Sequence, residues 1–533
     1  MSAFRHIVSG SGFVLAVAAA AFVAEPSAAP LAPPATITAA QCAALKNVAL
    51  PETTIESAAE VAGPSFTPPG SPALNNLPPF CRVVAVTRPA VRFEVWLPMT
   101  TWNGKFQGVG NGGTAGVISY GALAIGIRRG YATASTDTGH VSKDSADSSW
   151  ALGRPDLIAD FGYRGLHVMT ENGRKLTASL YETAPRYSYY VGCSKGGQQG
   201  LMEAQRYPAD YDGLVAGAPA QNATRSYLAG HLWPALATEA DPESYLPASK
   251  VPVLARAVTA ACDAIDGITD GVIDDPRKCQ FDPMSIVCKD GQDPATCLTA
   301  KQAAAVKKIY AGATNSKGER LYSPFMPGAE SGAGAWERYV TGDGPGDGRH
   351  RRLADGFLKY VVFQDPNYDL RTFNYDTDFP LALKKVSQMI DAMDPNLGPL
   401  KQRGGKLVVY HGWNDPSIPA LNSIEYYESV VAAMNKGVTR EAALAETQSF
   451  YRLFMVPGMQ HCSGGPGTDS FDMLTALENW VEKGQAPASI LATHRTAGHV
   501  ERSRPLCPYP QVAVYSGSGS TDEAANFSCR PPR

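Results

Sequence analysis

The sequence lacks a strongly basic segment. Its 533 residues include 47 Lys and Arg against 50 Asp and Glu, for a net charge of −3. Proteins that bind nucleic acid usually carry a basic face or arm, so this balance argues against a nucleic-acid partner. With 44% hydrophobic and 18% charged residues, the chain is also too apolar and too balanced in charge for a disordered protein.

The sequence also lacks an apolar run of the ~20 residues that a transmembrane helix needs. The best candidate, residues 13–24 (FVLAVAAAAFVA), follows Arg5 and precedes a stretch of small residues and prolines. A short basic region, a short apolar region and small residues at a cleavage site are typical of a secretory signal. We therefore expect residues 1–29 to be a signal peptide and the mature protein to be secreted or periplasmic, without a membrane partner. The alternative is an N-terminal anchor.

No C-x-x-C or His-x-x-x-His spacing is present, which argues against a zinc site built on cysteines. The ten cysteines form an even set, and an exported protein with such a set is expected to contain disulfides. Spacing along the chain suggests five pairs: Cys42–Cys81, Cys193–Cys462, Cys262–Cys279, Cys288–Cys297 and Cys507–Cys529.

Short apolar segments alternate with helix-like segments over much of the chain. We predict strands at 91–97, 105–109, 131–135, 187–191, 214–216, 406–410 and 451–456, and helices at 171–181, 197–206, 424–434 and 471–483. Such alternation favours an α/β fold with a parallel sheet covered on both faces. The alternation of strand-like and helix-like segments stops between about 221 and 404, and we therefore predict that this stretch is an inserted lid. The expected domains are a core in two parts, 30–220 and 405–533, and the lid, 221–404.

One predicted strand runs directly into a G-x-S-x-G motif. The strand YSYYV (187–191) is followed by Gly192-Cys193-Ser194-Lys195-Gly196 and then by a helix-like segment. A serine on a tight turn between a strand and a helix is the nucleophile elbow of α/β-hydrolases. The simpler interpretation is an ordinary turn between a strand and a helix.

A serine nucleophile needs a base and an acid that orients the base. In α/β-hydrolases the chain order is Ser, Asp or Glu, then His. Asp415 and His461 each follow a predicted strand and lie in that order after Ser194. The competing candidates are His411, Asp137, His140 and Asp394.

Two cysteines lie beside the predicted catalytic residues. Cys193 precedes Ser194, and Cys462 follows His461. A disulfide requires Cα atoms within about 7 Å, so this pair would hold the predicted nucleophile and base together. The rival hypothesis is that Cys193 is itself a reactive thiol.

At these residues the sequence resembles the tannase and feruloyl esterase family, which includes mono(2-hydroxyethyl) terephthalate hydrolases. The matching stretches are 192–220, 410–416, 456–474 and 502–519. The resemblance implies an α/β-hydrolase fold with a large inserted lid, Ser194, Asp415 and His461 as the catalytic triad, and the same five disulfides.

An acidic stretch, CDAIDGITDGVIDD (262–275), lies in the expected lid. Its spacing is not that of an EF-hand, and spacing alone describes a solvated loop as well as a calcium site. The family resemblance implies a structural Ca²⁺ ion. The expected ligands are the side chains of Asp263, Asp266 and Asp270 and the backbone carbonyls of Ile268 and Val272.

The oxyanion intermediate needs two backbone N–H donors. One is expected from Lys195, which follows the nucleophile, and the other from Gly113 or its neighbour Gly112 in a glycine loop after a strand. Candidates for recognition of the acid are the side chains of Lys195, Arg349, Arg351 and Arg352, and Trp413 and Ile418 flank Asp415 as possible pocket residues.

We therefore predict a secreted serine carboxylesterase that acts on a small aromatic ester, with feruloyl (hydroxycinnamoyl) esters as the leading substrates. Galloyl esters, as in a tannase, and mono(2-hydroxyethyl) terephthalate are the alternatives within this class. A calcium-stabilised binding protein on an inactive hydrolase scaffold, and a redox enzyme that uses Cys193, are alternatives from other classes.

Overall fold

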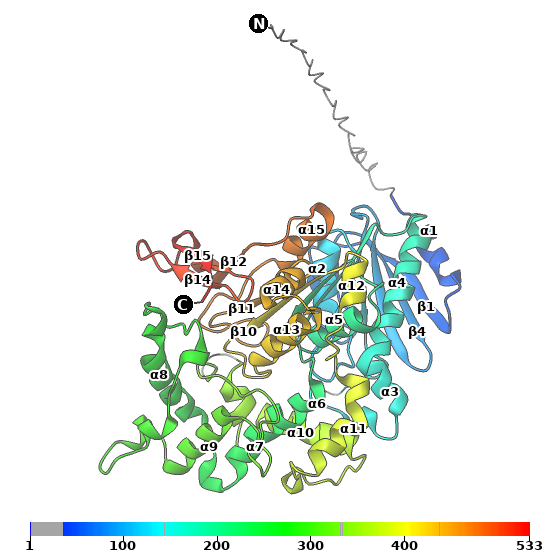
Figure 1. The fold of residues 1–533 in the computed structure, drawn as a ribbon. Helices are drawn as coiled ribbons and strands as arrows, with labels where there is room; N and C mark the ends of the chain where they lie inside the picture. Colours follow the sequence, from blue (N-terminus) through cyan, green and yellow to red (C-terminus); the bar gives the residue numbers. More distant parts are fainter. Residues whose placement is uncertain (2–35, 143, 331, 333, 436, 533) are drawn as a thin grey trace. The chain divides into compact units, whose positions relative to one another are not determined.

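The computed structural model describes Met1 and residues 36–532, except 143, 331, 333 and 436. The predicted signal peptide therefore lies outside the described residues, apart from Met1. Residues Ala35–Arg533 form one compact unit (Figure 1). No helix in the described part of the chain is both long enough and apolar enough to cross a membrane.

The described residues contain a central sheet of nine strands in the order β1-β4-β5-β7-β6-β8-β9-β10-β11. From β7 to β11 neighbouring strands are parallel, whereas β1, β4, β5 and β7 pair in antiparallel fashion. The strands are β1 (Thr53–Val61), β4 (Phe80–Thr87), β5 (Val91–Pro98), β6 (Lys105–Val109), β7 (Ala132–Thr136), β8 (Tyr187–Cys193), β9 (Gly213–Gly217), β10 (Lys406–Gly412) and β11 (Tyr451–Val456). The predicted parallel sheet is present from β7 to β11, and antiparallel strands extend it at one side; β4 and β5 are joined by a link of three residues, which allows only antiparallel pairing.

Helices cover both faces of this sheet. Successive strand residues point to opposite faces, so Tyr190 of β8 packs with residues of α4 and α5, whereas Tyr189 packs with α15. The helices of the first face are α4 (Gly165–Tyr181), α5 (Lys195–Arg206), α13 (Leu421–Met434) and α14 (Arg440–Gln448); those of the second are α2 (Tyr120–Arg128) and α15 (Met473–Lys483). Because both faces are covered, nearly all residues of β7, β9 and β10 are buried, including the polar side chains of β7.

A large helical insertion separates β9 from β10. Its described residues form helices and loops and contribute no strand to any sheet (Figure 1, green to yellow). The helices are α6 (Ala223–Arg225), α7 (Leu232–Glu239), α8 (Val251–Cys262), α9 (Ala300–Ala311), α10 (Arg349–Gly356), α11 (Asp378–Ile390) and α12 (Gly398–Gln402). The insertion lies between Gly217 and Lys406, and its helices were not predicted.

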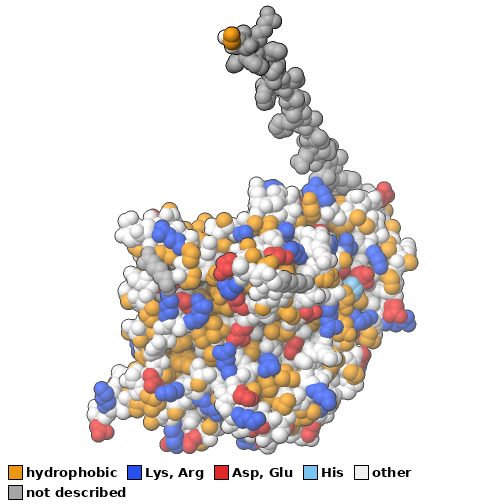
Figure 2. All heavy atoms as spheres, viewed as in Figure 1, with side chains coloured by type: hydrophobic (Ala, Val, Ile, Leu, Met, Phe, Trp, Pro, Cys, Tyr) orange, Lys and Arg blue, Asp and Glu red, His pale blue; other side chains and the backbone are white. Residues whose placement is uncertain are grey.

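Several smaller elements lie outside the central sheet and the helices that cover it. Helix α1 (Ala39–Ala44) packs near β1, and α3 (Pro155–Ala159) precedes α4. Three two-stranded sheets complete the described structure: β2 (Ser65–Phe66) with β3 (Leu74–Asn75), β12 (Ile490–Thr496) with β13 (His499–Leu506), and β14 (Val512–Tyr515) with β15 (Phe527–Arg530). Basic and acidic side chains are interspersed over the face shown in Figure 2, in keeping with the small net charge.

All five predicted cysteine pairs are disulfides in the structure: Cys42–Cys81, Cys193–Cys462, Cys262–Cys279, Cys288–Cys297 and Cys507–Cys529. No cysteine of the described chain remains as a thiol. The hypothesis that Cys193 acts as a reactive thiol therefore loses its basis.

Candidate active site

Ser194 lies on a tight turn between β8 and α5. Its backbone φ of 63° and ψ of −120° are unusual for a residue with a side chain, and its N–H donates to the carbonyl of Gly217 at 2.9 Å. The neighbouring glycines allow this close approach. A Cβ on Gly197 would lie 2.3 Å from the Gly217 carbonyl oxygen, and one on Gly192 would lie 2.7 Å from the backbone of Gly196. The turn presents Ser194 at the N-terminus of α5, where the helix dipole favours negative charge.

The structure brings Ser194, His461 and Asp415 into one hydrogen-bonded chain. His461 Nε2 lies 2.8 Å from Ser194 Oγ, and His461 Nδ1 lies 2.7 Å from Asp415 Oδ2. Asp415 follows β10 and His461 follows β11, so both come from the carboxyl ends of parallel strands, as Ser194 does. With Nδ1–H donating to the carboxylate, Nε2 is free to accept the serine proton.

Asp415 is buried and holds its charge through several partners. Its Oδ1 accepts the N–H groups of Ser417 and Ile418 at 2.8 and 2.9 Å. Burial alone would raise the pKa of Asp415, but His461 and His411 outweigh it and hold that pKa well below its usual range. The carboxylate therefore stays ionised to orient the imidazole.

The competing residues occupy supporting positions. His411 is fully buried, donates from Nε2 to Asp415 at 3.1 Å and accepts from Ser423 Oγ at Nδ1, so it supports the acid. Asp137 accepts the backbone N–H groups of Arg92 and Gly139. His140 stacks on Trp150 with ring centroids 3.8 Å apart. The fourth candidate, Asp394, is exposed in the loop after α11.

The disulfide between Cys193 and Cys462 joins the two loops that carry Ser194 and His461. Its Cα atoms lie 6.1 Å apart, although 269 positions separate the cysteines. Each cysteine adjoins a member of the hydrogen-bonded chain, so the bond limits how far Ser194 and His461 can separate.

The glycine loop after β6 lies beside the elbow. Gly112, Gly113 and Lys195 border the same cavity as Ser194, and in the described part of the chain neither Gly113 nor Lys195 donates its backbone N–H to another group. Gly113 has φ +57°, and a Cβ there would lie 2.2 Å from the Ser145 carbonyl oxygen, so glycine is required.

Sequence reasoning missed the pair that fixes this loop. The Asn111 N–H donates to Gln199 Oε1 at 3.0 Å, and Gln199 Nε2 donates back to Asn111 Oδ1 at 2.9 Å. The pair ties the glycine loop to α5.

A cavity of about 450 Å³ opens onto Ser194 and His461. Its aromatic and apolar walls come from both parts of the molecule: Val117, Phe161 and Ile418 from the core, and Tyr227, Tyr339 and Leu353 from the insertion. Volumes of 300–1,000 Å³ are typical of small-molecule sites. Side chains of the insertion, which we call the lid, therefore border the same cavity as Ser194.

Comparison with known proteins agrees with this geometry. Residues 75–530 match the family described as tannase and feruloyl esterase. An uncharacterized esterase of Xanthomonas campestris pv. campestris is 42% identical over 528 residues, covering 92% of this chain and 91% of that protein. The chain belongs to the tannase and feruloyl esterase family.

Two further relatives extend the comparison. The mono(2-hydroxyethyl) terephthalate hydrolase of Piscinibacter sakaiensis is 35% identical, with 83% of this chain and 82% of that protein covered. The crystal structure of feruloyl esterase B from Aspergillus oryzae superposes with a TM-score of 0.83 at 29% identity, covering 92% of this chain and 100% of that one. The protein is thus a carboxylic ester hydrolase with the α/β-hydrolase fold.

The lid of this esterase places cations at the cavity. Arg338 and Arg349 both border it, while Lys195 turns its Nζ onto the Phe161 ring at 3.7 Å and onto Gln198. Arg349 is only 8% exposed, its Nε has no partner, and no acidic side chain of the described chain pairs with it. The other two candidates lie elsewhere: Arg351 pairs with Glu239, and neither it nor Arg352 borders the cavity.

A buried histidine pair, one member of which also borders the cavity, had no signal in the sequence. His231 and His350 face each other with Nδ1 atoms 2.7 Å apart. Burial, followed by the charge of Arg349, lowers the pKa of His350 to about 3, and burial also holds the pKa of His231 well below its usual value. Both rings are therefore neutral in ordinary buffers.

The carboxylates of the acidic loop accept hydrogen bonds from the backbone N–H groups of the same loop. The carboxylate of Asp263 accepts the N–H of Gly271 at 3.0 Å, Asp266 accepts that of Ile268 at 2.8 Å, and Asp270 accepts that of Val272 at 3.1 Å.

The side chains of Asp263, Asp266 and Asp270 do not converge into a three-donor group in the described structure. The set nevertheless offers oxygen donors alone, as a hard cation prefers, although the carboxylate of Asp270 also pairs with the guanidinium groups of Arg502 and Arg504. Burial and the negative charges of Asp266 and Asp270 raise the pKa of Asp274 to about 8.

A larger cavity, of about 520 Å³, lies between this loop and the C-terminal sheets, away from Ser194. Trp413 borders this second cavity and carries the Arg277 guanidinium over its ring, 5.1 Å from the centroid. Of the two predicted pocket residues beside Asp415, only Ile418 therefore borders the catalytic cavity.

Proposed function

We propose that this esterase hydrolyses esters of aromatic acids through an acyl-enzyme on Ser194. Ser194 Oγ attacks the ester carbonyl while His461 Nε2 takes its proton, and His461 then protonates the departing alcohol. Water, activated by His461, hydrolyses the acyl-enzyme and regenerates the serine. The observation that carries the proposal is the 2.8 Å contact between Ser194 Oγ and His461 Nε2 at the edge of an aromatic cavity.

Backbone groups stabilise the charge that develops on the carbonyl oxygen. We assign the two donors to the N–H groups of Gly113 and Lys195, which are unpaired in the described chain and lie beside Ser194. Two such donors in a site that excludes water contribute several kcal/mol to transition-state stabilisation, about 3 kcal/mol each.

Feruloyl (hydroxycinnamoyl) esters are the leading substrates. A flat acyl group can lie against the aromatic side chains of Tyr227, Tyr339 and Phe161, which border a cavity of suitable size. Galloyl esters share the flat ring but need more polar partners for their three hydroxyls.

A second substrate class follows from Arg349. A buried guanidinium without an acidic partner favours a substrate that brings its own carboxylate, such as a monoester of terephthalic acid. The test is a comparison of kcat/KM for methyl ferulate, propyl gallate and mono(2-hydroxyethyl) terephthalate. Turnover of none of the three would contradict the proposal and favour a binding protein on an inactive scaffold.

We also propose export of the enzyme, because residues 1–29 have the pattern of a signal peptide and the ten cysteines form five disulfides. The N-terminal residue of the protein recovered outside the cytoplasm tests this point. Recovery of a chain that still begins at Met1 would contradict cleavage.

A further inference from the structure

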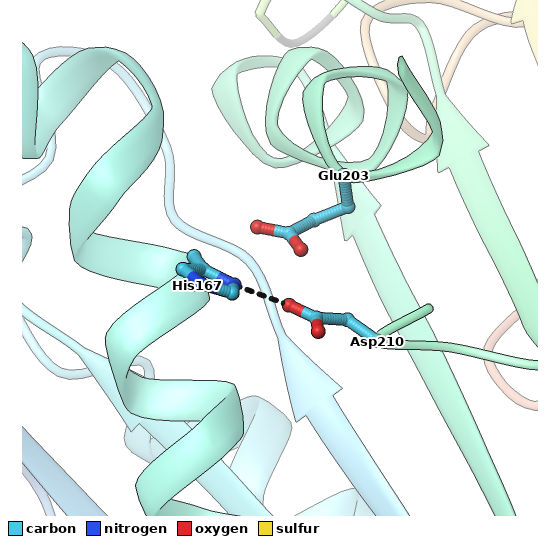
Figure 3. A group of neighbouring side chains, drawn as sticks. All are labelled: His167, Glu203 and Asp210. Carbon is cyan, nitrogen blue, oxygen red and sulfur yellow. Dashed lines mark hydrogen bonds and ion pairs between the residues drawn. The ribbon is translucent and has the colours of Figure 1, made fainter. Parts of the chain in front are cut away.

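A second cluster of ionisable side chains lies at the opposite end of α5 from Ser194. Glu203 is nine residues beyond Ser194, or about 13 Å along a helix that rises 1.5 Å per residue. His167 in the first turn of α4 and Asp210 in the loop before β9 lie beside it (Figure 3). None of the three residues borders the catalytic cavity.

The three side chains converge from three separate elements. His167 Nδ1 lies 2.6 Å from Asp210 Oδ2, and one donor atom from each of the three residues lies within 4.8 Å of the other two. Figure 3 shows the Glu203 carboxylate directed toward the other two side chains. A metal ion bound at about 2.1 Å requires donor atoms roughly 3–3.6 Å apart, which small side-chain rotations would provide.

Glu203 has no partner for its charge. The residue is 1% exposed, and neither of its carboxylate oxygens accepts a hydrogen bond. In the part of the chain that the structure describes, no lysine or arginine pairs with Glu203 or with Asp210. A buried carboxylate is costly unless a hydrogen-bond donor or a cation compensates it.

The imidazole is already oriented toward the two acids. The His167 ring stacks on Tyr207 with centroids 3.7 Å apart and an interplanar angle of 5°. The N–H of Asp210 donates to the Tyr207 carbonyl at 3.0 Å, which fixes the loop that carries the second acid. Such support of a ligand by its neighbours is typical of metal sites.

We propose that His167, Glu203 and Asp210 bind one Zn²⁺ ion, with water as the fourth ligand. One imidazole nitrogen and two carboxylates are donors that zinc accepts, whereas calcium prefers oxygen donors alone. The two carboxylates balance the charge of the ion. On binding, the metal displaces the proton on His167 Nδ1 and any proton held by the two carboxyl groups, and these protons pass to solvent. The ion then links α4 to α5 away from the chemistry.

The test is zinc titration of the untagged, full-length enzyme after removal of transition metals, in buffer that contains calcium. We expect saturation at one equivalent, a higher melting temperature and an unchanged kcat. Glu203→Gln, which keeps the side-chain shape, should weaken zinc binding at least ~10-fold. Glu171→Gln is the matched control, because Glu171 lies 3.7 Å from His167 Nε2 but is half exposed and outside the cluster.

Two results would overturn the proposal. One is the absence of a saturable zinc site in the parent enzyme, and the other is equal zinc affinity of the parent and Glu203→Gln. If Glu203→Gln does not fold, His167→Gln provides the same comparison, because that side chain is 23% exposed and tolerates substitution better. An enzyme with the expected zinc site but no ester turnover would contradict only the function proposed above.

Discussion

The carboxyl edge of the sheet and the inserted lid both border the catalytic cavity, yet they fix their residues by different means. At the edge, Ser194 follows β8 directly, and Asp415 and His461 lie within five residues of the ends of β10 and β11, so the sheet register largely sets their positions. In the lid, Tyr339 and Arg349 also border the cavity. Contacts between lid helices that are far apart in sequence, such as α7 and α10, set their positions. The comparison suggests that the chemistry resides in the sheet edge and the substrate choice in the lid.

The largest effect is expected at the edge. Ser194→Ala should lower kcat about 10⁶-fold with little change in stability, because the nucleophile is lost while the elbow remains. His461→Ala should behave alike, and Asp415→Ala should cost about 10⁴-fold. The measurement is kcat for a p-nitrophenyl ester beside the thermal unfolding curve. Retention of a few per cent of kcat in Ser194→Ala would exclude it as the nucleophile.

The Cys193–Cys462 and Cys507–Cys529 disulfides allow a comparison within the core, because only the first adjoins Ser194 and His461. Replacement of Cys193 and Cys462 by alanine should lower kcat by up to ~100-fold at temperatures where the variant is folded, since a shift of about 1 Å between catalytic groups has that cost. Both this pair and Cys507–Cys529 should stabilise the fold by a few kcal/mol. The Cys507/Cys529 double variant is the control and should keep kcat. Equal kcat in both variants would show that the first bond is only a structural cross-link.

The lid should control selectivity instead of the chemical step. Arg349→Gln should lower kcat/KM for mono(2-hydroxyethyl) terephthalate by about 10–100-fold, because a hydrogen bond to a charged group contributes about 1.5–3 kcal/mol. The value for methyl ferulate should change little. Arg352→Gln is the control, since Arg352 does not border the cavity. A uniform loss on both substrates would assign Arg349 to the lid structure and not to recognition.

Calcium should matter for the stability of the lid and not for catalysis. We propose that the loop with Asp263, Asp266 and Asp270 binds a structural Ca²⁺ ion, whose removal with a calcium chelator should lower the melting temperature while kcat at low temperature is kept. Readdition of calcium, but not of zinc, should restore the melting temperature. An unchanged melting temperature, after elemental analysis shows the calcium gone, would contradict a calcium site.

The smallest effect is expected from Asp137 at the end of β7. Burial raises the pKa of its carboxyl to about 7, against the hydrogen bonds from Gly139 and Arg92, whereas the unfolded chain has a value near ~4. The folded state therefore keeps the proton that the unfolded state releases, so this group lowers stability as pH rises from about 4 to 7.

The substitution Asp137→Asn keeps a side-chain oxygen that can accept the N–H groups of Arg92 and Gly139, and it removes the ionisable carboxyl group. From pH 5 to pH 8 the free energy of unfolding of the parent should therefore change by about 1–3 kcal/mol more in the destabilising direction than that of Asp137→Asn, measured by denaturant titration at both pH values. An identical pH dependence in the two proteins would mean that Asp137 is ionised in the folded state.

The sequence predicted the sheet edge well because short-range rules act there. The strand at 187–191, the G-x-S-x-G turn and the order of Ser194, Asp415 and His461 are local or ordered features, and the cysteines beside them restrict the geometry further. Predicted strands at 105–109 and 451–456 have the observed bounds.

Features that depend on distant contacts were not predicted. Strand β1 is mostly exposed, β4 is buried on both faces, and the lid helices alternate with irregular loops, so none of them gives a clear periodicity. The His231–His350 pair and the contact between Asn111 and Gln199 join residues about 90–120 positions apart. No local pattern records such a pairing.

Covalent labelling of the nucleophile tests the central claim most directly. An aryl phosphate inhibitor of serine esterases, mixed with the parent enzyme, should phosphorylate one residue per chain as activity disappears, and peptide mass spectrometry should place the adduct on Ser194. Ser194→Ala should take up no label, and His461→Ala should react far more slowly. Complete loss of activity with the adduct on another residue, or activity that resists the inhibitor, would contradict the account.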